Sequence, residues 1–271
     1  MLPIKKIYID SRFKTSDSAS QTDFKIDLPS TLYLPDNTGL FITDISIPVS
    51  WYTIDSGRNN LFYFGVAVGI GNQQVFTGSI APGNYTITTL ASAISDAMNS
   101  KSTALSIGVF TITPYIAQNK ITITNNLYPF KLFTDEELPG IANFTAPYNS
   151  MNRVLQNITV SNTMSLSFTS GFLDLHPIRN LYLVSPNLGT FDTLNVTGEM
   201  NVIKKIPVNA NYNEMVYDQV VLSYDYVDVS KQTMKRLEFQ LKDIYGSVID
   251  LKGDHWSFSL LFAKIPEHHG H

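Results

Sequence analysis

Three of the chain's five histidines, His268, His269 and His271, lie close together near its C-terminus. Imidazole nitrogens bind divalent transition metals well, so this cluster is a candidate metal site. Chain ends are usually unstructured unless something holds them, and an unstructured segment holds no fixed coordination geometry. We therefore predict a solvated chain end here, with these three histidines as the weak metal-site alternative.

The other two histidines are candidates for a catalytic base. His176 precedes Pro177, which places it in a turn, and His255 precedes Trp256 at the predicted start of a strand. Covalent hydrolysis needs a nucleophile, a base and an orienting group that converge. Neither histidine lies in a nucleophile motif such as G-x-S-x-G. The sequence therefore predicts no catalytic residue and no bound cofactor.

Neighbouring carboxylates would suit a glycosidase or an oxygen-rich calcium loop. Three such pairs occur: Asp225 with Asp228, Asp250 with Asp254, and Glu136 with Glu137. All of them lie beside predicted turns or on the solvent side of predicted strands. We therefore interpret them as turn and solubility residues.

Glycines and aromatic residues suggest two further kinds of binding site. Gly65, Gly69 and Gly71 lack the order and the following helix of a phosphate-binding loop, so a β-ribbon with bulges is predicted. The aromatic residues at 51–52 and 62–64 would suit stacking on sugars or bases. Their place in predicted strands favours core packing and subunit contacts instead.

The composition excludes several classes of protein. The 271 residues include no cysteine, so disulfides and thiolate metal sites are absent. A net charge of −4 with only 15% charged residues argues against binding nucleic acid through its phosphates. No apolar run is long enough to span a bilayer, and no signal peptide is predicted. The 44% hydrophobic content suits a protein that buries surface against neighbouring subunits.

Apolar and polar residues alternate in both terminal parts of the chain, which predicts half-buried β-strands. The pattern is clearest where Leu237, Phe239 and Leu241 alternate with polar residues. Further strands are predicted at residues 7–10, 24–28, 41–47, 164–169, 179–184, 200–206, 220–226, 248–251 and 256–262.

The middle of the chain has a different pattern. Helical spacing of apolar residues predicts one helix over 88–99, with Thr88 as its N-cap. A hairpin follows over 112–115 and 120–124, and a capping-box pattern at Thr134 predicts a short helical turn. We therefore predict an all-β protein: a single jelly-roll antiparallel sandwich from residues 1–59 and 151–271, with an inserted α+β/β subdomain at 60–150. Pattern alone leaves other Greek-key folds open.

Several stretches together resemble one family. At the N-terminal end they are residues 8–14, 20–29 (SQTDFKIDLP), 40–48 (LFITDISIP) and 51–54, and in the middle they are residues 80–86 (IAPGNYT). Near the C-terminus, residues 237–241 (LEFQL), 243–246 and 248–262 (VIDLKGDHWSFSLLF) complete the set. In this order the stretches resemble the penton, or minor capsid, proteins of virophages and Polinton-type double-stranded DNA elements.

The resemblance implies a structural virion protein that forms homopentamers at icosahedral capsid vertices, beside a double-jelly-roll major capsid protein. It implies no catalytic residue, and it leaves the residues of the subunit interface unknown. From its polar composition, we expect the segment at 11–22 to be mobile in the free protein and ordered by a neighbour. Two other hypotheses stay open: a host-binding fibre-head or lectin-like sandwich, and a glycosidase on a sandwich fold.

Overall fold

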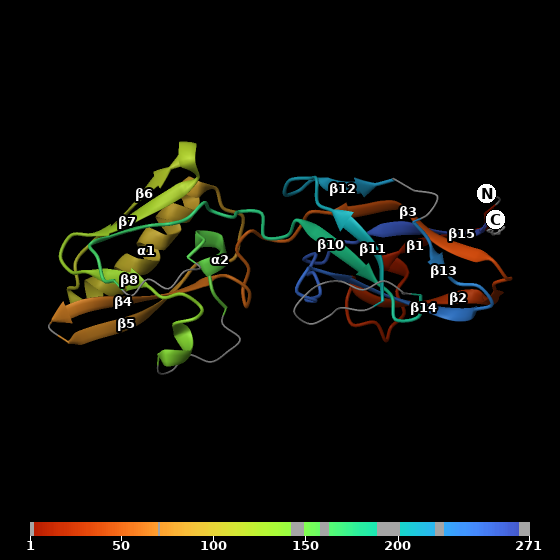
Figure 1. Cartoon of the computed structure of the whole chain (residues 1–271), viewed down its shortest axis with the longest axis horizontal. Coiled ribbons are helices and arrows are strands. Elements are labelled where there is room, and N and C mark those ends of the chain that lie inside the picture. The colour runs from red at the N-terminus through yellow and green to blue at the C-terminus, as the bar shows by residue number, and fades with distance from the viewer. Residues whose placement is uncertain are drawn as a thin grey trace, which may run out of the picture. The chain divides into compact units, whose positions relative to one another are not determined.

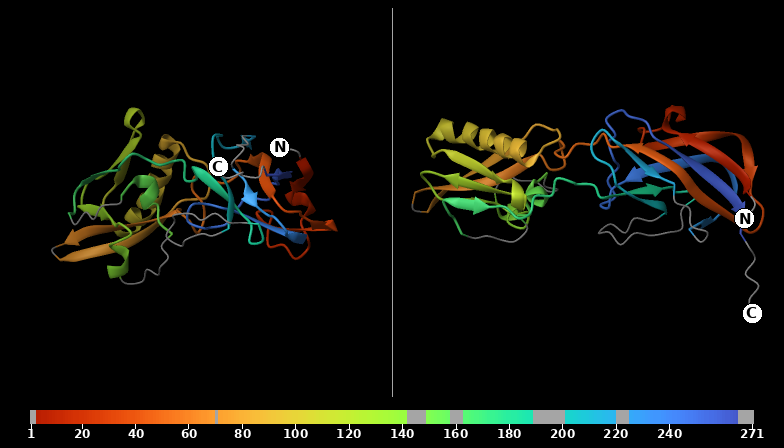
Figure 2. Two further views of the ribbon diagram at one scale, coloured as in Figure 1. Left: turned by 45° about the vertical axis from the view of Figure 1, so that its right-hand side comes forward. Right: turned by 90° about the horizontal axis from the view of Figure 1, so that it is seen from above.

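The structure is a computed structural model, and the chain folds into two compact units (Figures 1 and 2). The first unit comprises Met1–Trp51 and Ile178–His271, and the second comprises Tyr52–Pro177. The residues that the structure describes are 3–69, 71–141, 149–157, 163–188, 201–219 and 225–265.

The first unit consists of two antiparallel sheets. Its strands are β1 (Pro3–Asp10), β2 (Asp23–Tyr33), β3 (Thr38–Pro48), β10 (Asn180–Val184), β11 (Val202–Pro207), β12 (Met215–Asp218), β13 (Val227–Asp228), β14 (Thr233–Lys242) and β15 (Ser257–Lys264). One sheet has the order β1-β15-β3-β12, and β13 also pairs with β3. The other sheet has the order β11-β10-β14-β2.

The strand order identifies the fold. β12 and β13 pair with opposite ends of β3, on the edge that β15 leaves free, so together they act as one interrupted strand. Strands numbered along the chain then follow the orders 1-8-3-6 and 5-4-7-2. This arrangement of two Greek keys is a jelly roll. The predicted fold class is therefore confirmed.

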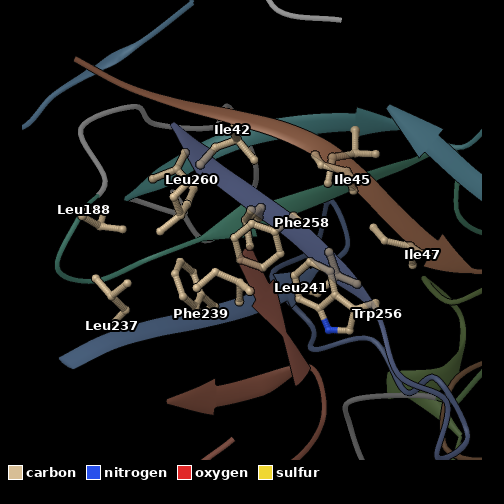
Figure 3. Close-up of a cluster of buried hydrophobic side chains, with 14 of the residues drawn as sticks. Ile42, Ile45, Ile47, Leu188, Leu237, Phe239, Leu241, Trp256, Phe258 and Leu260 are labelled. Atoms are coloured by element: carbon tan, nitrogen blue, oxygen red, sulfur yellow. The ribbon is translucent and has the colours of Figure 1, made fainter. Parts of the chain in front are cut away.

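Alternating side chains fill the space between the two sheets (Figure 3). Phe239 of β14 and Phe258 of β15 meet edge to face with ring centroids 4.9 Å apart. Trp256 packs edge to face on Phe24 at 5.8 Å. Because a shift of one residue would turn these rings outward, the apolar alternation fixes the register of each strand.

The second unit combines two small sheets with a helix. Its elements are β4 (Leu61–Gly69), β5 (Asn72–Ser79), α1 (Ile87–Leu105), β6 (Phe110–Tyr115), β7 (Lys120–Asn125), β8 (Phe130–Leu132), α2 (Asn152–Leu155) and β9 (Ser167–Thr169). The sheets have the orders β5-β4-β8 and β6-β7-β9 and are joined by a bridge between Phe130 and Ser165. Leu90, Ile94 and Met98 of α1 are buried in the same core as both sheets.

The helix α1 is longer than the predicted 88–99. Thr86, rather than Thr88, is the N-cap, because Thr86 and Thr89 each accept a hydrogen bond from the other's backbone N–H. The helix continues past Asn99. The Asn99 side-chain amide donates to the carbonyl of Phe110 on β6, and its side-chain oxygen accepts the N–H of Phe110. Within the described residues, no helix combines the length and hydropathy that a bilayer crossing requires.

The boundaries of the insertion differ from the predicted 60–150. Ile54 forms a β-bridge with Gly83, which draws residues before 60 into the second unit. After residue 150, Met151, Val154 and Leu173 are buried in the core of the second unit. The inserted unit therefore spans Tyr52–Pro177, so residues 52–59 and 151–177 belong to it and not to the jelly roll.

The expectation that residues 11–22 form a mobile arm is wrong. Ser11 and Thr22 are buried, and the Thr22 hydroxyl donates to the carbonyl of Ile249. The N–H of Thr15 donates to the carbonyl of Lys25 on the edge strand β2. The short polar residues supply hydrogen bonds that fasten this segment to the sandwich without any neighbouring subunit.

The other local predictions agree in part with the described structure. The strand predicted at 248–251 is absent, and only an isolated bridge joins Val248 to Lys242. The hairpin β6–β7 turns at a 3-10 helix, Ile116–Gln118. The backbone N–H of Thr134 donates to the Glu137 carboxylate, and a short 3-10 turn, Leu138–Gly140, follows. The predicted strand at 220–226 falls mostly outside the described residues, and the short strand β13 follows it.

Candidate assembly surfaces

The histidine candidates do not form a described site. His268, His269 and His271 lie outside the described residues. The backbone N–H of His176 donates to the side chain of Asp174 at 3.1 Å, as expected of a residue in a turn. Within the described ranges, no three histidine or carboxylate side chains gather in a way that would hold a metal ion.

His255 has a partner that the sequence did not reveal. Its Nδ1 lies 3.0 Å from the hydroxyl of Ser11, and the carboxylate of Asp10 adjoins Ser11 in the chain. These are the residue types of a hydrolytic triad, but Ser11 is fully buried and its hydroxyl accepts the backbone N–H of Trp256. Asp10 is held by Arg12, whose hydrogen bonds lower the pKa of that carboxyl. The group therefore acts as a structural contact rather than a nucleophilic centre.

The carboxylate pairs are separated by other partners. Asp225 faces the ammonium of Lys204, whereas Asp228 accepts the backbone N–H of Ser230. Asp250 pairs with Lys252 at 2.9 Å. Glu137 pairs with Lys131 at 2.8 Å. The contacts of the aspartates agree with the interpretation as turn and surface residues, whereas the Glu137 side chain is mostly buried with Lys131.

The aromatic and glycine predictions are confirmed where they concern packing. Trp51, Phe62, Tyr63 and Phe64 are buried. The segment 61–79 is the β4–β5 hairpin, with a register shift between Ala67 and Gly69. These four aromatic side chains are therefore not accessible for stacking on a ligand, whereas Tyr52 is half-buried.

Exposed aromatic side chains are the most prominent feature of the jelly-roll surface. Six of them are between 48% and 77% exposed: Tyr8, Phe13, Tyr33, Tyr212, Tyr217 and Tyr245. Aromatic residues are enriched at protein interfaces, where they supply large contact areas at a small cost in side-chain entropy. The jelly roll thus carries candidate contact residues on several sides.

Two of these tyrosines lie on opposite edge strands of one sheet. Tyr8 is on β1 and is 77% exposed, and Tyr217 is on β12 and is 60% exposed. Both side chains lie on the solvent side, because Ile9 and Val216 beside them point into the core. The sequence signal was available at Tyr8, where an aromatic residue occupies a position that alternation assigns to the solvent side.

A charged contact spans the sheet next to Tyr8. The ammonium of Lys6 lies 5.2 Å from the Tyr8 ring centroid and also bonds the carboxylate of Asp44 on β3. Asp44 has a left-handed backbone at a bulge, where β3 shifts its register against β15. The hydrogen bond from Lys6 lowers the pKa of the Asp44 carboxyl.

The second sheet carries a polar network on its outer side. Arg236 of β14 donates two hydrogen bonds to Asp27 of β2 and one to Asp17. Lys25 lies 3.5 Å from the same Asp17 carboxylate. This sheet therefore carries several ion pairs on its outer side, in addition to the exposed Tyr33 at the end of its edge strand β2.

A cluster of loops lies at one end of the sandwich. Because adjacent strands are antiparallel, the connections at 11–22, 208–214 and 243–256 emerge at the end from which the chain leaves for the second unit. They are bonded to one another and to the end of β3, for example through Ser50 to the carbonyl of Leu251. Their exposed apolar side chains are Phe13, Tyr212, Ile244, Tyr245 and Val248.

Comparison with known sequences gives one match. The sequence model of a family of unknown function, DUF5901, matches residues 34–248, which is more than half of the chain. No curated protein matches the chain.

Comparison with solved structures gives matches over the whole chain. The selenomethionine-labelled mavirus penton protein is 12% identical, with a TM-score of 0.52 over 96% of this chain and 100% of that chain. A chain in the cryo-EM structure of the Sputnik virophage is 10% identical over 96% of this chain and 98% of that chain, but its TM-score of 0.40 is too low to support an argument. At 12% identity, the first likeness shows a shared fold.

Proposed function

This chain belongs to the DUF5901 family of unknown function, and we propose that it is a structural subunit of a virus capsid. The observation that carries the proposal is the fold shared with the mavirus penton protein. The match covers that chain completely and nearly all of this one, so it includes both the jelly roll and the inserted unit.

In its finer form, the proposal is a penton. Five copies form a ring at each icosahedral vertex of a double-stranded DNA virus, and a double-jelly-roll major capsid protein surrounds the ring. The protein is then located in the virion after assembly in the host cell. The name of the mavirus protein and the resemblance of the sequence motifs support this form.

A cyclic ring needs two different surfaces on each subunit, because the contact is heterologous and repeats around the axis. The jelly roll offers such a pair at opposite edges of one sheet, marked by Tyr8 and Tyr217. Each contact can be modest in area, since neighbours in a closed ring or shell hold one another at high effective concentration. We therefore assign the subunit contacts to these two edges.

Electron microscopy of the purified full chain tests the proposal. Rings with fivefold symmetry are expected at micromolar or higher concentration, either alone or with the major capsid protein of the same virus. Trimeric particles would contradict the penton assignment and favour a host-binding sandwich. Particles of single-chain size under all of these conditions would contradict self-assembly.

A further inference from the structure

The second unit has a regular array of hydroxyl groups on the outer side of the sheet β6-β7-β9. The registers place Thr113, Thr122 and Thr169 side by side in one row. The next row contains Thr111, Thr124 and Ser167. Each strand thus contributes two hydroxyl residues separated by one apolar residue.

The array is open to solvent. All six side chains are exposed except that of Thr122, which is half-buried between its neighbours. The hydroxyls of Thr122 and Thr169 lie 2.9 Å apart. On the opposite side of the sheet, Phe110, Ile121 and Ile123 are buried in the core. The array is therefore a firmly supported face, with rows about 7 Å apart along the strands and columns about 4.8 Å apart between them.

Threonine is common in exposed strand positions, and cross-strand threonine pairs stabilise sheets. That preference does not explain the absence of charge. Edge strands are protected from unwanted pairing by charged residues or by proline. β6 is an edge strand that has Pro114 in this role, and its sequence FTITPY contains no charged residue.

The low charge extends over the whole second unit. Residues 52–177 contain 5 of the 19 basic and 6 of the 23 acidic residues, although they make up almost half of the chain. On the array side of β6 and β7, the charged residue is Lys120, which lies opposite Tyr115 at one end. A surface of this kind complements an uncharged partner rather than a charged one.

We propose that this face binds a neutral polysaccharide. A threonine hydroxyl can both donate and accept hydrogen bonds, which matches the hydroxyl groups of an uncharged sugar chain. Thr124 donates to the carbonyl of Thr111 and Thr122 bonds Thr169, so these hydroxyls offer mainly their remaining acceptor capacity. The regular rows suit a ligand that is itself periodic, whereas a protein surface is irregular. Tyr115, which is 48% exposed, provides a ring at the end of the array on which a sugar can stack. This site is separate from the proposed capsid contacts, which belong to the jelly roll.

The experiment uses the full chain and measures binding to chitin and cellulose as solids, and to xylan and a mixed-linkage β-glucan in solution. Binding to at least one of these four probes is expected, and equal binding to heparin is not. The triple variant Thr113→Val, Thr122→Val, Thr169→Val keeps the shape and the strand preference but removes one row of hydroxyls. Affinity should fall at least about tenfold, given the usual net strength of three hydrogen bonds.

The matched control is Thr233→Val, which changes an exposed strand threonine in the jelly roll and should leave binding unchanged. Absence of binding to all four probes would overturn the proposal, as would a triple variant that binds as well as the parent chain. Sedimentation of the parent chain and the triple variant tests whether a second copy of this chain, rather than a polysaccharide, binds to the face. Self-association that the triple substitution abolishes, without any polysaccharide binding, would assign the face to subunit contact instead.

Discussion

The hydroxyl of Ser11 lies 3.0 Å from Nδ1 of His255, although 244 residues separate them in the chain. The same hydroxyl accepts the backbone N–H of Trp256 at 3.1 Å. Ser11 follows β1 and His255 precedes β15, which are neighbours in the sheet. The contact thus holds the segment that follows β1 against the segment that precedes β15, the last strand of the jelly roll.

Ser11→Ala should destabilise the first unit. The substitution leaves the buried N–H of Trp256 without its acceptor, which costs about 1–3 kcal/mol. Urea unfolding followed by tryptophan fluorescence measures the effect, because Trp256 lies beside the lost contact. Ser16→Ala is the control: Ser16 is exposed on the same segment and should change the unfolding free energy by less than about 0.5 kcal/mol. Equal stability of the two variants would show that the contact has no structural role.

Gly78→Ala should destabilise the second unit. The Phe62 ring lies over Gly78 on the neighbouring strand, and an added Cβ would clash with the Phe62 Cζ atom. The ring is buried and cannot move without disturbing the core, so we expect a cost of about 1–3 kcal/mol. Gly69→Ala is the matched control, since nothing lies within 4 Å of an added Cβ there. Thermal unfolding of both variants checks the difference, and an unchanged melting temperature for Gly78→Ala would contradict this packing.

Stability should fall in acid in a way that depends on Arg236. Its hydrogen bond to the Asp27 carboxylate lowers the pKa of that carboxyl. The pKa of Asp17 is lowered first by a hydrogen bond with Thr15 and to a smaller extent by attraction to Arg236. A carboxyl with a lowered folded-state pKa stabilises the fold above its unfolded pKa of about 3.9 and loses that contribution as pH falls through the folded value. The loss therefore lies below about pH 4.

Arg236→Gln removes the guanidinium and should flatten this acid dependence. Urea midpoints at pH 7, 4 and 3 for both proteins measure it. The difference between variant and parent should be small at pH 7, because exposed ion pairs contribute little, and should shrink further toward pH 3. A difference that grows as pH falls would refute the linkage.

Tyr8→Ser and Tyr217→Ser should each weaken ring formation without affecting the fold. Both side chains are exposed, so the unfolding free energy should change by less than about 0.5 kcal/mol, whereas loss of an aromatic contact residue typically weakens an interface strongly. Ile116→Ser is the control, since Ile116 is 70% exposed on the second unit. Sedimentation equilibrium compares the three variants. Unchanged ring formation by both tyrosine variants would move the subunit contacts away from these edges.

The sequence predicts the strands of the jelly roll well because the alternation is regular, as at Leu237, Phe239 and Leu241. The pairing of those strands does not follow from alternation, since β1 pairs with β15 from the other end of the chain. Alternation therefore makes the jelly roll the preferred sandwich while leaving other Greek-key folds open, and the strand order confirms the jelly roll. The insertion boundaries differ because alternation predicts the strand at 164–169, which contains β9, without showing which unit it joins, and because α2 with four residues is too short to show a helical period.

The candidate surfaces were less predictable than the fold. The hydroxyl residues of β6 and β7 alternate visibly with isoleucine, but only the strand register reveals that they align in rows with β9. Ser11 carries no sequence signal of its contact with His255, because long-range hydrogen bonds leave no local pattern. Conversely, the polar composition of residues 11–22 predicts a mobile segment, because composition cannot show that its hydroxyl groups form hydrogen bonds within the jelly roll.

The central claim is that this chain is a capsid subunit that closes into rings of five. The mass of the purified full chain in solution, measured by sedimentation equilibrium over a range of concentrations, tests it most directly. The chain mass is 30.3 kDa, and the expected species at high concentration has five times that mass. A species of three chains, or one of a single chain at every concentration, would contradict the claim.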